Sequence, residues 1–209
     1  MKLLRVNMSQ LQALWEPVPE VYTRLAGRAL IARLLLEEIS PTCDALGPHN
    51  KLIFTPGLLG GAMVTASGRL SVGGKSPLTG GVKEANAGGT AGDILGKLET
   101  KAIVIEGQAQ RGKWYLLHLA GETVELLPAD DVLGLGTYDT ADRLQQRFGL
   151  DSTVISIGQA GEFLMQGAGI ACTGDHEQRS NHAARGGLGA VMGSKGLKAI
   201  IIDKPISKQ

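Results

Sequence analysis

The chain repeats one fifteen-residue pattern after about one hundred residues. Gly92–Glu106 reads GDILGKLETKAIVIE and Gly189–Asp203 reads GAVMGSKGLKAIIID; six positions are identical and four more are conservative exchanges. Solenoid repeats have periods of about 20–50 residues, so the longer spacing indicates a duplicated half-domain. We expect half-repeats over about 50–106 and 151–203. Their two glycine-rich turns would face one shared ligand across an approximate two-fold axis.

Apolar runs and turn residues predict strands and helices in a mixed order. The expected strands cover 3–6, 51–55, 68–73, 101–106, 153–158, 169–172 and 199–203, with a hairpin over 113–127, and the expected helices cover 21–39, 88–98, 140–148 and 186–195. Regular βαβ alternation is absent from this order. The mixed order of strands and helices favours an α+β fold and one domain over 1–209. We expect duplicated half-domains with two mixed β-sheets flanked by helices, related by pseudo-two-fold symmetry. The hairpin and the helix at 140–148 are interpreted as an insertion between the repeats.

The composition restricts the class of protein. The net charge is +1, which gives no broad electrostatic footprint for nucleic acid. The sequence shows no apolar run of about 18 residues and no signal peptide at its start. We therefore expect no membrane partner and a cytoplasmic location. The two cysteines, Cys43 and Cys172, match no zinc or iron–sulfur spacing and are expected to be free thiols.

Glycine makes up 30 of the 209 residues, roughly twice its usual share of about 7%. In the segment Arg185–Lys195, small residues open a helix. Free backbone N–H groups and the helix dipole favour an anion at such a place, although the order Gly-Ser-Lys does not fit a P-loop. The same glycines would also let the helix pack closely on a sheet, and the residues alone leave both interpretations open.

The first copy of the repeat has a similar glycine turn. Asn86–Gly89 stands at the corresponding place, and Arg69 and Lys75 lie upstream as candidate donors to the same anion. A metal site of His and Asp side chains is disfavoured by the loose spacing of its candidates, Asp175, His176 and His182. Doubling of the glycine turn, with basic residues near both copies, favours a ligand that carries two anionic groups.

Three segments resemble the N-terminal domain of the aldehyde ferredoxin oxidoreductase family. They are Gly74–Gly80 (GKSPLTG), Ala85–Gly89 (ANAGG) and Ala184–Lys195 (ARGGLGAVMGSK), supported by RVN at Arg5–Asn7 and NKLI at Asn50–Ile53. The resemblance covers essentially the whole chain. It implies two similar halves, in each of which a sheet supports one of two pterin-dithiolene cofactors.

The resemblance also implies an activity and a set of site residues. Members of the family are tungsten, sometimes molybdenum, enzymes that oxidise aldehydes to carboxylic acids and pass electrons to ferredoxin. Carried over to this sequence, Arg69, Asn86 and Gly88 would contact one pterin. Arg185 and the turn His182–Ala184, with Ala184 at its end, would contact the other. A magnesium ion between the pterin phosphates would be held by the backbone carbonyls of Asn86 and His182, since oxygen ligands suit magnesium.

Two departures from the family pattern lie in the second half. The family commonly has an arginine where this chain has Asn181, and a small residue where it has His182. In the family, the cysteines of a [4Fe–4S] cluster and the substrate pocket belong to later domains. We therefore expect no catalytic residue in this chain and a need for missing C-terminal domains or a partner subunit. Ferredoxin would be reached through the complete enzyme, and a homo-oligomer stays open. The alternative is a non-catalytic pterin- or phosphate-binding module, or a split subunit that acts only with a partner chain.

Overall fold

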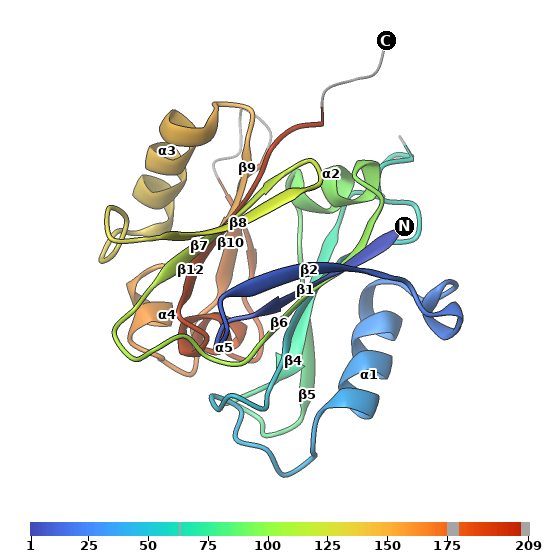
Figure 1. Ribbon diagram of the computed structural model, residues 1–209, viewed down its shortest axis with the longest axis horizontal. Coiled ribbons are helices and arrows are strands. Elements are labelled where there is room, and N and C mark those ends of the chain that lie inside the picture. Colours follow the sequence, from blue (N-terminus) through green and yellow to red (C-terminus); the bar gives the residue numbers. More distant parts are fainter. Residues whose placement is uncertain (63, 175–179, 206–209) are drawn as a thin grey trace.

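The computed structural model describes residues 1–62, 64–174 and 180–205, which form two six-stranded mixed sheets flanked by helices (Figure 1). The first sheet has the strand order β2-β1-β6-β3-β4-β5 and the second has the order β11-β10-β9-β12-β7-β8. The strands of the first sheet are β1 (Lys2–Asn7), β2 (Gln12–Pro17), β3 (Leu52–Pro56), β4 (Leu70–Lys75), β5 (Val82–Ala87) and β6 (Thr100–Glu106). Those of the second are β7 (Tyr115–Ala120), β8 (Thr123–Pro128), β9 (Thr153–Ser156), β10 (Ile170–Cys172), β11 (Asn181–Ala183) and β12 (Leu197–Ile202). The helices are η1 (Glu20–Tyr22), α1 (Gly27–Glu38), α2 (Ala91–Lys97), α3 (Thr137–Phe148), α4 (Gln159–Glu162) and α5 (Leu188–Ser194). The expected α+β class is confirmed.

The two sheets contain equivalent strands in the same order. Read from β5 and from β11, the first sheet runs β5, β4, β3, β6, β1, β2 and the second runs β11, β10, β9, β12, β7, β8. One pair in each sheet is parallel, β1 with β6 and β7 with β12, and the other pairs are antiparallel. The hairpin β7–β8 and helix α3 therefore take the places of β1–β2 and α1. Their interpretation as an insertion is wrong, because the duplication extends to the first strands of the chain.

Packing of the apolar side chains produces five layers. Helix α1 covers the outer face of the first sheet and α3 covers the outer face of the second, and the two helices lie on opposite sides of the molecule in Figure 1. Helices α2 and α5 lie between the sheets and contribute Leu95 and Val191 to the main core, which also contains Phe54 and Ile200. Within the described residues, none of the helices is long and apolar enough to cross a membrane.

Several elements differ from the sequence prediction for local reasons. The helix expected from residue 21 begins only at Gly27, because Ala26 is extended and Gly27 is left-handed, with φ of 52°. Strands β5 and β11 were not predicted, since β5 reads VKEANA and β11 reads NHA, and neither shows an apolar period. They are strands because β4 and β10 offer them paired backbone partners.

The repeated lysine has the same structural role in both halves. Lys101 and Lys198 are buried, and each ammonium donates to a backbone carbonyl in the segment that leads into an outer helix. Lys101 Nζ lies 2.8 Å from the carbonyl oxygen of Thr23 ahead of α1, and Lys198 Nζ lies 3.0 Å from that of Leu135 ahead of α3. Lys198 also pairs with the Glu162 carboxylate. Burial lowers the pKa of Lys101, so the lysine is kept for these contacts despite a desolvation cost.

The repeated glycines permit close backbone contact. A Cβ on Gly96 of α2 would lie 2.1 Å from the carbonyl oxygen of Gly60, and a Cβ on Gly193 of α5 would lie 2.0 Å from that of Gly161. No real side chain fits at such distances. The packing interpretation of these glycines therefore holds in both halves, which explains why the pattern G-x-x-x-G is retained at Gly92–Gly96 and Gly189–Gly193.

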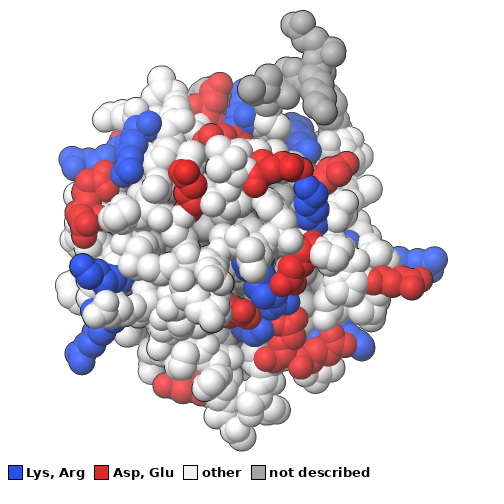
Figure 2. All heavy atoms as spheres, in the orientation of Figure 1, with Lys and Arg blue, Asp and Glu red and all other residues white. Residues whose placement is uncertain are grey.

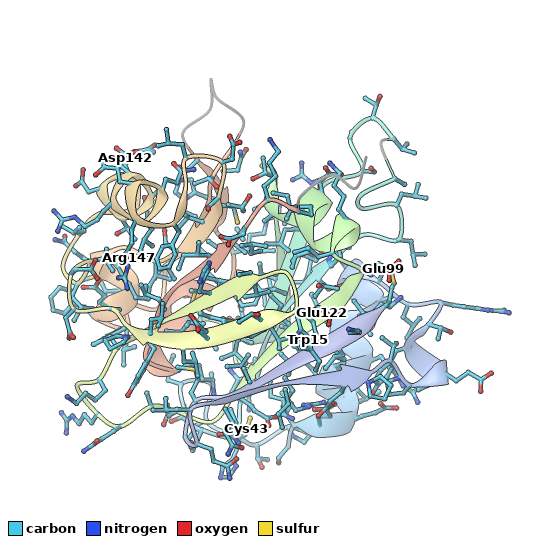
Figure 3. The ribbon with its side chains drawn as sticks, turned by 45° about the horizontal axis from the view of Figure 1, so that its top comes forward. Trp15, Cys43, Glu99, Glu122, Asp142 and Arg147 are labelled. Carbon is cyan, nitrogen blue, oxygen red and sulfur yellow. The ribbon has the colours of Figure 1, made fainter. Side chains whose placement is uncertain are left out.

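The edge strands of the two sheets meet at β2 and β8. Trp15 Nε1 donates to the carbonyl oxygen of Glu122 over 2.8 Å, and Figure 3 shows the two residues close together. Lys2 forms an ion pair with the Glu122 carboxylate at the same place. The two sheets are thus also joined at their β2 and β8 edges, at the opposite end from the glycine turns.

The two thiols should differ in reactivity. Cys172 is fully buried, which raises the pKa of its thiol to about 12, whereas Cys43 is partly exposed. Thiolate is the reactive form, so at about pH 8 a thiol reagent should modify one cysteine per folded chain and both cysteines in urea. Folded Cys43→Ser should show no fast reaction, and rapid modification of that variant would contradict the buried position of Cys172.

Candidate functional site

Five of the six predicted site residues line one cavity of about 230 Å³ where β5 approaches β11. The first half supplies Arg69 and Asn86, and the second half supplies His182, Ala184 and Arg185. The sixth residue, Gly88, is not part of the lining. A Cβ on Gly88 would lie 2.9 Å from the Oδ1 atom of Asn181, so the glycine lets the ends of β5 and β11 come together.

The strand register relates Asn86 and His182 by the pseudo-two-fold axis. Asn86 of β5 stands opposite Ser71 of β4, and His182 of β11 stands opposite Ala171 of β10. Ser71 and Ala171 are each the second residue of equivalent strands. The two residues predicted to offer their carbonyls to one metal ion are thus matched positions that meet at one cavity.

The two predicted arginines are not matched in this way. Arg69 comes directly before β4, and the residue directly before β10 is Gly169. Arg185 follows His182 by three residues, and the residue three after Asn86 is Gly89. Each half therefore supplies an arginine from a different position, so a symmetric scaffold carries an asymmetric arrangement of charge.

Each glycine turn packs on the opposite half. The Ser76 hydroxyl donates to the carbonyl oxygen of Gly186 over 2.6 Å. Thr90 N–H donates to the carbonyl oxygen of Thr173 over 3.2 Å, and the hydroxyls of Thr90 and Thr153 are 2.6 Å apart. A Cβ on Gly89 would lie 2.3 Å from the carbonyl oxygen of Thr173 in the opposite half. These contacts hold β5 and β11 beside each other and thereby form the cavity.

The cavity contains two polar residues that the sequence did not single out. Arg28, from the first turn of α1, and Glu84, from β5, complete its lining. Arg28 Nε lies 3.2 Å from Glu84 Oε2. The Asn86 amide donates to Glu84 Oε1 and, over 2.9 Å, to the Ser71 hydroxyl. Glu84 could have been predicted, because it lies two residues before Asn86 on the same face of a strand. Arg28 could not, because in the sequence it looks like any exposed charge on a helix.

The electrostatics of the cavity favour an anion. The residues that line the cavity include three guanidinium groups and one carboxylate. The Arg69 and Arg185 side chains are exposed, and neither has an ion-pair partner within the part of the chain that the structure describes. On the face seen in Figure 2, Lys and Arg are interspersed with Asp and Glu between wide uncharged areas. The net charge of the chain is only +1, so the three arginines of the cavity are a local concentration of positive charge.

Two other candidates for the site do not join it. Lys75 donates its ammonium to the carbonyl oxygens of Pro41 and Cys43, at 2.5 Å and 2.6 Å, so the expectation that it shares an anion with Arg69 is wrong. Asp175 and His176 lie outside the described residues. Across residues 1–62, 64–174 and 180–205, no three His, Cys, Asp or Glu side chains gather as metal ligands.

The chain is thus a duplicated two-sheet domain with an arginine-lined cavity at the junction of its halves. The family model described as "Aldehyde ferredoxin oxidoreductase, N-terminal domain" matches residues 3–204. The chain belongs to the aldehyde ferredoxin oxidoreductase family, within the N-terminal domain of that family.

Curated relatives and a solved structure agree with this assignment. The tungsten-containing aldehyde ferredoxin oxidoreductase of Pyrococcus furiosus is 38% identical over 205 residues, which cover 97% of this chain and 33% of the relative. The aliphatic sulfonate oxidoreductase, WOR-like subunit, of the same organism is 31% identical over 196 residues, covering 84% of this chain and 29% of the relative. The active site complex BamBC of benzoyl coenzyme A reductase with 1,5-dienoyl-CoA has the same fold. Its TM-score is 0.89 at 29% identity, with 97% of this chain and 30% of that chain covered. The chain thus spans about a third of the length of the curated relatives it matches.

Proposed function

We propose that the chain is the cofactor-binding domain of an oxidoreductase that carries tungsten, or molybdenum, on two pterin-dithiolene groups. The observation that carries this proposal is the cavity at the junction of the halves, where Arg69 and Asn86 of the first half meet His182 and Arg185 of the second. Its positive lining suits the phosphate of each pterin, since guanidinium and phosphate form strong charge-assisted hydrogen bonds. The bound metal would supply the redox chemistry.

The residues of the chain would bind and orient the cofactor. Arg69 and Arg185 would each hold a phosphate, and Gly88 would keep the strand ends close enough for both pterins to share one cavity. The backbone carbonyls of Asn86 and His182 would hold a magnesium ion between the phosphates, because matched carbonyls near a two-fold axis offer it oxygen ligands from both sides.

We further propose aldehydes as substrates and ferredoxin as the electron acceptor, in line with the names of the relatives at 38% identity. The two cysteines of this chain are too few for a [4Fe–4S] cluster. A cluster and the contact with ferredoxin would belong to the two thirds of the relatives' length that this chain does not cover, either as further domains or as a partner subunit. Both cysteines are free, which fits a reducing compartment such as the cytoplasm.

Charge reversal tests the proposed phosphate contacts. In protein isolated from cells that make the tungsten cofactor, Arg69→Glu and Arg185→Glu should each reduce the metal and pterin content at least about tenfold. A lost charge-assisted hydrogen bond costs about 1.5–3 kcal/mol, and the new carboxylate repels phosphate in addition. The measurements are elemental analysis and fluorescence of the released pterin. Arg111→Glu, at an exposed position outside the cavity, is the matched control. Full cofactor content in both cavity variants would show that the cavity does not hold the cofactor.

A further inference from the structure

We propose that Arg28 is a third anion-binding residue of the cavity and that Glu84 is its positioning residue. This inference rests on the proposed function and deepens it, because it states which half of the site binds its anion more strongly. Both residues line the cavity together with Arg69 and Asn86. Arg28 comes from α1, so a helix on the outside of the first sheet contributes to the site at the junction of the halves.

The contact between Arg28 and Glu84 leaves the arginine able to bind a ligand. Only Nε of Arg28 donates to Glu84, at 3.2 Å from Oε2. Within the described residues, no hydrogen bond is recorded for its two terminal Nη groups, which are the groups that grip a phosphate in bidentate fashion. The Arg28 side chain is 75% exposed, so the guanidinium contacts Glu84 through Nε while its Nη groups remain open to a ligand.

Glu84 holds two cavity residues at once. Its side chain is only 8% exposed, and its two carboxylate oxygens accept from Arg28 and from the Asn86 amide respectively. The Ser71 hydroxyl accepts the second bond from that amide at 2.9 Å. A nearly buried carboxylate next to an anion site would repel the anion. Its presence is explained if its contribution is to fix Arg28 and Asn86 in place.

The second half has the corresponding side-chain pair without the arginine. Ser180 stands two residues before His182, as Glu84 stands two before Asn86, and Ser180 Oγ lies 3.1 Å from His182 Nε2. The second residue of α3, which corresponds to Arg28 of α1, is Tyr138. Among the residues that the structure describes, the extra cation and its carboxylate therefore belong to the first half only. We expect that half, with Arg28 and Arg69, to bind its anionic group more tightly than the second half, with Arg185.

Pyrophosphate binding to the full chain tests this assignment. Calorimetric titration at low salt should show that Arg28→Gln weakens the affinity about tenfold, as loss of one charge-assisted bond predicts. Glu84→Gln should weaken it too, although that change removes a negative charge, because Arg28 is released. The double variant should bind no more weakly than Arg28→Gln alone, because the Arg28–Glu84 contact is already lost there and a glutamine carbonyl at position 84 still accepts from the Asn86 amide. Arg24→Gln, an exposed arginine outside the cavity, is the control.

Four other results would each contradict a specific part of the proposal. Unchanged affinity in Arg28→Gln, with affinity lost in Arg69→Gln and Arg185→Gln, would remove Arg28 from the site and leave the proposed function intact. Tighter binding in Glu84→Gln would show that Glu84 acts only as a repelling charge. A fall in melting temperature that alone accounts for the weaker binding would make the Arg28–Glu84 pair structural. A parent chain that binds no pyrophosphate would overturn the anion cavity, and with it both proposals.

Discussion

Gly193→Ala is expected to destabilise the chain by about 3 kcal/mol or more, the upper range for overpacking of a core. The added methyl group would lie 2.0 Å from the carbonyl oxygen and 2.8 Å from the carbonyl carbon of Gly161. Both atoms are backbone, so no side-chain rotation relieves the contact. Helix α5 or the segment around α4 must move instead. Urea unfolding followed by tryptophan fluorescence measures the change, and a lowering of the melting temperature by roughly 10 °C should accompany it.

A glycine in the turn between α4 and β10 is the matched control. Gly167 has no neighbouring atom within 4 Å of an added Cβ, and its φ is not in the left-handed range. Gly167→Ala should therefore be neutral or stabilising by about 0.4–1 kcal/mol through the unfolded state. The first half offers the same comparison, with Gly96→Ala close to Gly60 and Gly81→Ala in open space. A small effect of either clashing variant would refute close packing of helix on loop in that half.

The sequence repeat predicted the fold where both copies bury the same backbone contacts. The glycines of α2 and α5 and the lysines of β6 and β12 have equivalent partners, so their identity was retained and detectable. The hairpins β1–β2 and β7–β8 lie at the sheet edge away from these contacts. Any side chains that suit a strand serve there, and the two copies share no pattern. The sheet order alone reveals that equivalence.

The site was predictable to the extent that it rests on backbone shape. Asn86, Gly88 and the turn at 182–185 lie where two strands end against the opposite half, and short motifs record that arrangement. Arg28 was not predictable, because it is one exposed charge on an amphipathic helix far away in sequence. Only packing of α1 beside β4 and β5 brings it to the cavity. The prediction that Lys75 binds the anion was wrong because a loop distant in sequence, Pro41–Cys43, supplies backbone carbonyls that bind its ammonium.

A buried lysine at the end of α5 should give the stability a distinct pH dependence. Lys195 has no exposed surface, and its Nζ donates to the carbonyl oxygens of Gly47, at 3.0 Å, and Asn50, at 2.5 Å. Burial lowers the pKa of Lys195 from 10.5 to about 8. A neutral amine has two N–H groups, so it still satisfies both carbonyls. It no longer has the desolvation cost of the ammonium.

The sign of the effect follows from where the proton resides. Below about pH 8 the folded and unfolded chains both hold it, and the desolvation cost is constant. Between about pH 8 and pH 10.5 the unfolded chain keeps the proton that the folded chain has released. Stability therefore rises with pH in that window, by about 1.4 kcal/mol per unit.

Lys195→Met removes the titration while keeping most of the side-chain volume. The free energy of unfolding of the parent, minus that of Lys195→Met, should be flat from pH 7 to about 8 and rise by roughly 2–3 kcal/mol by pH 10. Urea titrations at half-unit steps measure the difference, in which titration of all other groups cancels. Lys113→Met, which removes an exposed lysine, is the matched control. A flat difference for Lys195→Met across this window would mean that the buried ammonium keeps its proton. Gly47 and Asn50 of the first half would then hold a charged side chain of the second at every pH in the range.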